Sequence, residues 1–336
     1  MSKFQYHETL RLQNFTAFSD SHFEFIPGVN IFVGENGTGK THAMKAAYAF
    51  HLIQSLDLVD HPGSTIFRQI FQLSETSEVL RDSSGPHPKA IVSGKFGGNE
   101  WEMSPEASGG IVFRLNTRGL ETPVFFPATD MMAHTKGFVS LFDQRAIDFD
   151  RTYREIVSMF FTPELRELDN LSEVLADRLI DLLGGNLVQA GERFFIEADG
   201  KRRPMYLVAE GLRKISTLLQ LVRSGWLKPG TTLFWDEPEA NLNPRLMDEV
   251  AKAILMLARN GVQVFLATHS YLILEELKDA AGPGEVRYFG FEPSPDGVKV
   301  SWTDELPMLS PNAILDQYED LGTRKLKKAL APRLPA

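Results

Sequence analysis

The sequence predicts an α/β fold in which helices cover a mostly parallel sheet, and three stretches lead to this prediction. "GENGTGKT" at 34–41 follows the apolar run "VNIFV" and precedes a helical pattern. "TTLFWDEP" at 231–238 and "VQVFLATHS" at 262–270 are apolar runs that end in polar residues, with a helical pattern between them. Apolar strands that alternate with helices are typical of parallel sheets, whose ligands bind at the carboxyl ends of the strands.

The first segment predicts strands that lead into the glycine-rich stretch and a helix that leaves it. "ETLRLQNF" and "HFEFI" are extended patterns, and Pro27-Gly28 is a turn before the strand "VNIFV". "KTHAMKAAYAFHLI" is a helical pattern. Its shared face is expected to carry Met44, Ala47, Tyr48, His51 and Leu52.

The middle of the chain predicts strands first and helices afterwards. Residues 57–88 are rich in turns and give no assignment, whereas 89–126 has the pattern of a β meander. A helical insertion is expected over 146–185, with one helix that begins at Thr162-Pro163 and ends at Gly184-Gly185. A short β pair with the turn Asp199-Gly200 follows.

The last third predicts the remaining helices of the parallel sheet. "LRKISTLLQLV" places its apolar residues on one side, a further helix spans Pro244 to Arg259, and Ser310-Pro311 is expected to begin a closing helix. We expect one domain over 1–336. Its expected sub-regions are the N-terminal strands and loop helix (1–56), a β meander lobe (57–135), a helical insertion with the β pair (136–204), the core of helix and polar strand ends (205–275), and C-terminal strands with the closing helix (276–336).

Composition narrows the class of protein. The 336 residues are 43% hydrophobic and 24% charged, which is typical of a globular protein, and no apolar run reaches the length of a membrane span. The start lacks an apolar signal core, and the absence of cysteine excludes disulfides, thiolate metal sites and a cysteine nucleophile. We therefore expect a cytoplasmic protein without a membrane partner.

The charge balance gives little support to DNA binding as the main activity. Lys and Arg number 35 and Asp and Glu number 44, so the net charge is −9. Basic residues form only short clusters, at Lys201-Arg202-Arg203 and at Lys325, Lys327 and Lys328. Because a local basic groove is compatible with a negative total, nucleic-acid binding stays open.

The stretch at 34–41 has the spacing of a phosphate-binding loop. Glycines permit tight turns there, so that backbone N–H groups and the positive end of the next helix can hold phosphates. Lys40 would reach the β- and γ-phosphates of ATP, and Thr41 would offer its hydroxyl to Mg²⁺. The expected nucleotide contacts are Gly34, Glu35, Asn36, Gly37, Thr38, Gly39, Lys40 and Thr41.

Two strand ends supply the groups that hydrolysis of a phosphate bond needs. Asp236 follows an apolar strand, where its carboxylate can join the magnesium shell, and the next residue, Glu237, can act as a general base toward water. His269 ends the neighbouring apolar run, within reach of a γ-phosphate. We predict that Lys40, Glu237 and His269 carry the catalysis and that Thr41 and Asp236 hold the metal.

The loop, followed about 200 residues later by "DEPEANLNP" and then "ATHS", resembles the ABC-class ATPase core of SMC-type repair proteins, OLD-type nucleases and compact bacterial anti-phage defence ATPases of the AAA group. This resemblance implies a P-loop NTPase head with two lobes, one an antiparallel β lobe and the other a RecA-like parallel-sheet lobe, joined by a helical insertion. "VAEGLRKI" occupies the place of the family's signature helix, where Gly211 and Lys214 match. The resemblance implies that these two residues contact ATP bound to another subunit in a head-to-tail dimer, and that 241–243 passes signals across it.

Three positions depart from the family pattern. Ala209 stands where the signature usually has serine, which removes a γ-phosphate contact and is expected to slow or gate hydrolysis. Thr16 stands where relatives often carry arginine. The family's lobe-joining glutamine has no direct match, so that Asp130 in "FFPATDM" is either its stand-in or an ordinary loop acid.

The predicted function is that of an Mg²⁺-dependent ATPase. The resemblance implies homodimers or larger assemblies that control a separate effector, a nuclease or a toxin, in anti-phage defence. Two alternatives stay open: a DNA-associated SMC-like repair ATPase, and a slow or non-hydrolysing ATP-dependent scaffold. The helical insertion of about 40 residues is too short for long coiled-coil arms, and the 66 residues after Ser270 contain no acid cluster of nuclease type. We therefore expect no nuclease domain in this sequence.

Overall fold

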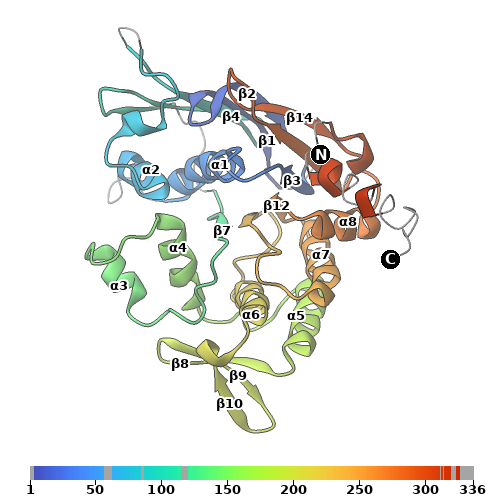
Figure 1. Cartoon of the computed structure of the whole chain (residues 1–336). Coiled ribbons are helices and arrows are strands. Elements are labelled where there is room, and N and C mark those ends of the chain that lie inside the picture. Colours follow the sequence, from blue (N-terminus) through green and yellow to red (C-terminus); the bar gives the residue numbers. More distant parts are fainter. Residues whose placement is uncertain are drawn as a thin grey trace, which may run out of the picture.

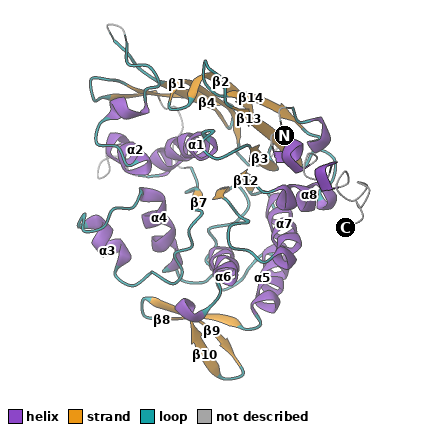
Figure 2. Cartoon of the chain, viewed as in Figure 1, coloured by secondary structure: helices purple, strands orange, loops and turns teal. Residues whose placement is uncertain are grey.

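The computed structural model describes residues 4–56, 63–84, 87–114, 120–310, 312, 314–318 and 323–325. These residues form a six-stranded sheet, a five-stranded sheet and a small three-stranded sheet, with helices packed between and around them (Figures 1 and 2). The predicted α/β fold with one antiparallel and one mostly parallel lobe is confirmed.

The six-stranded sheet carries the expected polar strand ends. Its order is β14-β13-β3-β12-β11-β7, and every neighbouring pair is parallel except β13 and β14. The central strands are buried on both faces, which explains their continuous apolar sequence. The strands are β3 (Val29–Val33), β7 (Val124–Phe126), β11 (Thr232–Asp236), β12 (Gln263–Thr268), β13 (Val286–Glu292) and β14 (Lys299–Thr303).

The five-stranded sheet is antiparallel, in the order β2-β1-β4-β5-β6, and contains the expected meander. Its inner face packs on helices α1 (Lys40–Ser55) and α2 (Gly63–Phe71), which lie beneath it in Figure 1. Alternate residues of β1, such as Leu10 and Leu12, are fully buried in this second core. The strands are β1 (His7–Phe15), β2 (Phe18–Glu24), β4 (Ile91–Phe96), β5 (Asn99–Pro105) and β6 (Ile111–Arg114).

Two strand predictions are wrong in detail. The meander does not extend to Phe126, because β7 leaves it and pairs with β11 in the six-stranded sheet. Strand β2 begins and ends earlier than "HFEFI" suggests, because Phe18 pairs with Phe15 directly across the tight turn that joins β1 to β2. Residues 57–88, which gave no assignment, contain α2 and the short 3-10 helix η1 (Thr76–Val79).

Most of the remaining helices, together with the small sheet, form the other end of the molecule (Figure 1). The small sheet has three strands instead of the expected pair and projects from the body below α6 (Figure 2). The helices are α3 (Phe138–Asp143), α4 (Arg151–Phe160), α5 (Asn170–Leu183), α6 (Glu210–Arg223), α7 (Pro244–Arg259), α8 (Tyr271–Ala280), η2 (Met205–Leu207) and η3 (Leu306–Met308). The small sheet consists of β8 (Asn186–Ala190), β9 (Arg193–Ala198) and β10 (Lys201–Pro204).

The prediction of a helix start at Thr162-Pro163 is wrong. Helix α5 begins at Asn170, where the Asp169 carboxylate accepts hydrogen bonds from the backbone N–H groups of Leu171 and Ser172. The Thr162 hydroxyl instead accepts a hydrogen bond from the indole of Trp226 at 3.0 Å. The helix end at Gly184 is confirmed, since this glycine has a left-handed φ of 63°. Most of the closing helix expected after Ser310 lies outside the described residues.

Two histidines are buried together between the antiparallel sheet and α1. His7 Nε2 lies 3.2 Å from His51 Nδ1, and each residue is only 1% exposed. The rings contact Phe96 and lie among further aromatic side chains. Burial lowers the pKa of His51 to about 3, and burial together with the nearby His51 ring lowers the pKa of His7 well below its usual value. Both imidazoles are therefore neutral in the fold.

We expect the free energy of unfolding to fall as the pH drops below about 6.5, the ordinary pKa of histidine. Below this pH the two histidines take up protons in the unfolded chain, whereas they stay neutral in the folded chain. Their contribution to the free energy of unfolding is therefore fully present above about pH 6.5 and is lost as the pH falls below it. At pH 5, His51 alone accounts for about 2 kcal/mol. Urea titrations at pH 7.5 and 5.0 measure the difference, which should shrink in His51→Asn and persist in His22→Gln, a change on the protein surface. An unchanged difference in His51→Asn would contradict this assignment.

Candidate functional site

The glycine-rich loop joins the buried strand β3 to helix α1, as the motif requires. Gly39 is the N-cap of α1 with a left-handed φ of 86°, and its lack of a side chain leaves the first N–H groups of the helix facing the loop. A Cβ at Gly34 would lie 2.9 Å from the carbonyl oxygen of Phe291 on β13, so only glycine fits. The loop therefore presents backbone donors and a helix N-terminus to one space, which suits an anion.

Lys40 places a positive charge at the centre of this loop. Its ammonium group donates hydrogen bonds of 2.7 Å to the carbonyl oxygens of Gly34 and Glu35. Burial lowers the pKa of Lys40, while the carboxylates of Asp236 and Glu237 act in the opposite direction. A further hydrogen bond stabilises the loop conformation, since the Thr38 hydroxyl donates to the carbonyl oxygen of Glu35.

Thr41 and Asp236 meet beside the loop, as predicted for a metal site. The Thr41 hydroxyl lies 2.9 Å from Asp236 Oδ2, although the two residues are 195 positions apart in sequence. Burial raises the pKa of Asp236 to about 6, against the lowering effect of the Thr41 hydrogen bond. A hydroxyl and a carboxylate that converge next to a phosphate loop are ligands of the kind that Mg²⁺ prefers, so these residues fit the expected ion.

These groups line a cleft of about 550 Å³, a size within the ordinary range for ligand pockets. Its wall includes the loop from Asn36 to Thr41, Asp236 and Glu237, and Thr16 and Ala17. Thr16, where relatives often carry arginine, thus lines the same cleft as the loop. The parts of the phosphate site predicted from residues far apart in sequence are therefore brought together.

Glu237 and His269 lie side by side at the carboxyl ends of β11 and β12. The strands are parallel neighbours in register from Thr232 opposite Gln263, which brings the two polar ends level. His269 Nδ1 is 3.3 Å from Glu237 Oε1. The backbone of Glu237 has a left-handed φ of 48°, which is uncommon for a non-glycine residue, and its N–H donates to the carbonyl oxygen of Ala267. The turn is thus held in a constrained shape at the predicted catalytic position.

Glu239 is a site residue that the sequence analysis did not identify. It is buried, and its Oε1 accepts a 2.6 Å hydrogen bond from the Thr268 hydroxyl and a 3.3 Å bond from the backbone N–H of His269. Its Oε2 is buried without a hydrogen-bond partner among the described residues. The sequence signal was the third acid of "DEPE", two residues after Glu237 and therefore on the same turn.

The signature residues occupy the start of α6, but Lys214 is not where the resemblance implied. Its side chain is fully buried, and its ammonium group donates a 2.9 Å hydrogen bond to the carbonyl oxygen of Glu237 in the same chain. Three residues after Gly211, it lies on the inner face of the helix and cannot reach a nucleotide on another subunit. Gly211 packs against the 241–242 backbone, and Ala209 is the N-cap of α6 without a side-chain cap.

Asp130 is bound to helix α6 by hydrogen bonds. Its side chain is 0% exposed, and its carboxylate accepts hydrogen bonds from Arg213, from Thr217 and from the backbone N–H of Met132. Burial raises its pKa, while these hydrogen bonds, that of Arg213 first, act against the shift. Its hydrogen bonds run to α6 and to its own loop, which agrees with the alternative of an ordinary loop acid.

We expect Asp130→Ala to lower the free energy of unfolding by about 3 kcal/mol. The largely buried guanidinium of Arg213 loses its hydrogen-bonded carboxylate and keeps only the Val208 carbonyl oxygen and, at 3.9 Å, Glu210. Urea unfolding measures the loss. Asp143→Ala is the matched control, because Asp143 is half exposed in its ion pair with Arg154. It should lower the free energy of unfolding by no more than about 1 kcal/mol. Equal small losses in both variants would show that Asp130 does not hold α6 in place.

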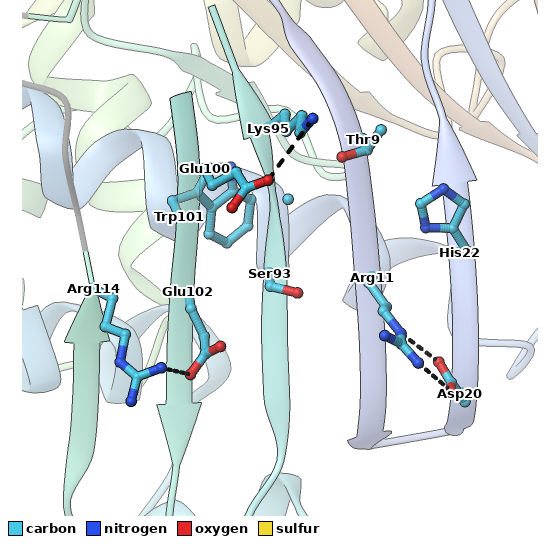
Figure 3. A pocket seen from close by; sticks show the side chains of 11 residues that line it. Thr9, Arg11, Asp20, His22, Ser93, Lys95, Glu100, Trp101, Glu102 and Arg114 are labelled. Atoms are coloured by element: carbon cyan, nitrogen blue, oxygen red, sulfur yellow. Dashed lines mark hydrogen bonds and ion pairs between the residues drawn. The ribbon is translucent and has the colours of Figure 1, made fainter. Parts of the chain in front are cut away.

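A larger hollow, of about 800 Å³, lies on the outer face of the antiparallel sheet (Figure 3). Cross-strand ion pairs cover it, at Arg11–Asp20, Lys95–Glu100 and Arg114–Glu102. These acids and bases compensate one another at the surface, as opposite charges on neighbouring strands commonly do. It contains none of the loop or strand-end residues and is therefore not the candidate site.

The described residues contain neither a helix long and apolar enough to cross a membrane nor a cluster of three or more His, Cys, Asp or Glu residues that could hold a metal ion. The candidate magnesium ligands are instead one hydroxyl and one carboxylate beside the phosphate loop.

Comparison with protein families finds two matching segments. Residues 120–275 match the family described as "AAA domain, putative AbiEii toxin, Type IV TA system", and residues 9–46 match a second AAA domain family. The first segment contains helix α6 and both polar strand ends, and the second contains the whole of the loop at 34–41. No curated protein matches the chain.

Solved structures share the whole fold at low sequence identity. The Smc head domain of Pyrococcus furiosus, bound to the C-terminal domain of ScpA, is 14% identical with a TM-score of 0.58, over 96% of this chain and 100% of that chain. The Smc head domain of Pyrococcus yayanosii is 10% identical with a TM-score of 0.58, over 95% and 100%. The recombination mediator protein RecF-ATPrS is 14% identical with a TM-score of 0.50, over 89% and 98%. The predicted resemblance is confirmed: AAA-domain segments lie on the ABC-type ATPase head fold of SMC proteins.

Proposed function

We propose that the chain is a single ATPase head domain that binds ATP with Mg²⁺ and hydrolyses it in head-to-tail pairs. The observation that carries this proposal is the convergence of five side chains at one edge of the parallel sheet. They come from three separate segments and are Lys40, Thr41, Asp236, Glu237 and His269. The AAA family matches support nucleotide binding.

The loop and the strand ends divide the chemistry between them. The N–H groups of 34–41 and the ammonium of Lys40 hold the β- and γ-phosphates, at the positive end of α1. Thr41 and Asp236 would hold Mg²⁺, which supplies positive charge to the phosphate oxygens. Glu237 accepts a proton as the water oxygen bonds to the γ-phosphorus and the bond to the β-γ bridging oxygen breaks, which yields ADP and phosphate. His269 donates a hydrogen bond to the γ-phosphate and remains beside Glu237.

The start of α6 would complete the site of a second copy. Ala209 provides no side-chain cap, so the first N–H groups of the helix are available to a γ-phosphate. A head-to-tail pair of identical chains buries two such sites, which makes assembly depend on ATP. We infer that this assembly controls a separate effector in anti-phage defence. The match of 120–275 to the AbiEii-type AAA family supports this role.

One alternative keeps specific support. Ala209 lacks the hydroxyl that the family's serine offers to the γ-phosphate, which favours a slow enzyme whose ATP-bound form acts as a scaffold. Phosphate release and the mass of the assembly, measured together with ATP and Mg²⁺, distinguish the two. Turnover with ATP-dependent dimers supports the enzyme, dimers without turnover support the scaffold, and monomers without turnover contradict both.

The effector role needs a test in cells. The gene, expressed with its immediate neighbours, should reduce the efficiency of phage plating, and Lys40→Ala in the same set of genes should abolish that protection. Protection that survives Lys40→Ala would contradict ATP-dependent control.

A further inference from the structure

The start of α6 and the catalytic turn are joined inside one chain by two buried charged residues. Lys214 lies on the inner face of α6, one turn from Gly211, and its ammonium group reaches the carbonyl oxygen of Glu237 at 2.9 Å. Glu239 lies on the same turn as Glu237 and is bound to the end of β12. Both side chains are buried, at 0% and 6–7% exposure, so neither can act on a ligand from solvent.

Burying two such charges is unfavourable unless they compensate each other. Burial lowers the pKa of Lys214, and the carboxylate of Glu239 is the largest influence in the opposite direction. Glu239 Oε2 has no hydrogen-bond partner among the described residues. The carboxylate acts on the two buried lysines Lys214 and Lys40 and lies 3.9 Å from His269 Nδ1. A pair of hydrophobic residues would fill this space at lower cost, so stability alone does not explain the two charges.

The contacts of this pair determine where both catalytic groups lie. Lys214 holds the carbonyl oxygen of Glu237, whose φ of 48° is uncommon for a residue with a side chain. Glu239 holds the backbone N–H of His269 and the hydroxyl of Thr268, which in turn accepts from the N–H of Ser270. The general base and the histidine are thus fixed by neighbours that do not touch the substrate.

We propose that Lys214 and Glu239 are positioning residues that couple the signature helix to the hydrolytic site of the same chain. This inference rests on the proposed function. When α6 closes on the nucleotide of a second copy, Lys214 moves with the helix and shifts the carbonyl of Glu237, while Glu239 transmits the shift to His269. One ATP site of a dimer thereby changes the rate at which the other hydrolyses ATP.

The test compares Lys214→Met and Glu239→Gln with the wild type and with Glu237→Gln. Met keeps the volume of the lysine stem, and Gln keeps both acceptor contacts of Glu239 but removes its charge. We expect kcat for ATP to fall about 10- to 100-fold in each variant, with KM and the Kd for ATP unchanged. The melting temperature of each single variant should fall, because a buried charge loses its compensation, and the double variant should recover part of that loss. Lys252→Met and Glu249→Gln, which remove charges from surface ion pairs on α7, are the matched controls and should retain wild-type kcat.

The double variant sharpens the test, because residues that act as one unit give non-additive losses. Lys214→Met with Glu239→Gln should lose no more kcat than the more severe single variant. Losses that multiply, or losses of kcat that accompany equal losses of ATP affinity, would overturn the inference in favour of two independent structural residues. Wild-type kcat in both single variants, with Glu237→Gln inactive, would overturn it and leave the proposed function intact. No phosphate release from the wild type would overturn the proposed function itself, and the inference with it.

Discussion

Glu237→Gln should lose phosphate release by about 100-fold or more while it continues to bind ATP. The carboxylate lies at the end of β11, 3.3 Å from His269 and next to the Asp236–Thr41 pair. Glutamine keeps its length and its hydrogen-bond acceptor but cannot take the proton of the attacking water. Because the ATP-bound state then persists, the variant should accumulate as a stable dimer with ATP and Mg²⁺.

Phosphate release and mass measurements on the same samples check this expectation. Glu164→Gln, which changes an exposed acid beside Arg223, is the matched control and should behave as the wild type. If Glu237→Gln hydrolysed ATP at the wild-type rate, the general base would be another residue. A variant that loses turnover without a longer-lived dimer would contradict the link between hydrolysis and disassembly.

Lys40→Ala should lower the affinity for ATP by about 100-fold, and turnover with it. The ammonium is the buried positive charge at the centre of the loop, held by the carbonyl oxygens of Gly34 and Glu35. Without it the phosphates face the carboxylates of Asp236 and Glu237 with only backbone donors to hold them. The fold should remain, since a smaller neutral side chain replaces a charge whose burial is unfavourable.

Calorimetric titration with ATP and Mg²⁺ measures this loss. Lys252→Ala, on the surface of α7, controls for the general loss of a positive charge. Equal affinity in Lys40→Ala and the wild type would show that ATP does not bind at the loop. Lower affinity in the Lys252 variant would point to a different anion site.

The positions of the catalytic elements could be predicted from the sequence because each has a local signature. The loop at 34–41 has fixed spacing between a strand and a helix, and the runs that end at Asp236 and His269 are apolar until their last residues. Parallel strands bring such ends to one edge, so the meeting of Glu237 with His269 followed from two separate local patterns. Helix α7 was also predicted with the bounds that it has, because Asn243-Pro244 is a strong start signal.

Long-range contacts could not be predicted, and they account for the corrections. Asp130 has the sequence context of a loop acid, and only its burial against Arg213 and Thr217 shows what it does. Lys214 matched the signature by spacing, but the side of α6 that faces the core depends on the rest of the fold. Strand β7 is three residues long and was assigned to the meander that precedes it, because its pairing with β11 bridges more than one hundred residues of sequence.

The central claim, that each active site combines the loop of one copy with the signature helix of another, is tested most directly by mixing two inactive variants. Lys40→Ala removes the loop's charge, and Gly211→Asp places an acid at the start of α6, where a Cβ has 3.1 Å to its nearest neighbours. Each alone should release no phosphate, with melting temperatures that confirm folding. In an equal mixture half of the dimers are mixed and one of the two sites in each is intact, so phosphate release should rise clearly above that of either variant, to at most about a quarter of the wild-type rate. The rate stays below a quarter to the extent that the copy with the intact loop needs its own α6, which carries Gly211→Asp, to act through Lys214. A mixture as inactive as its components would contradict a site shared between copies.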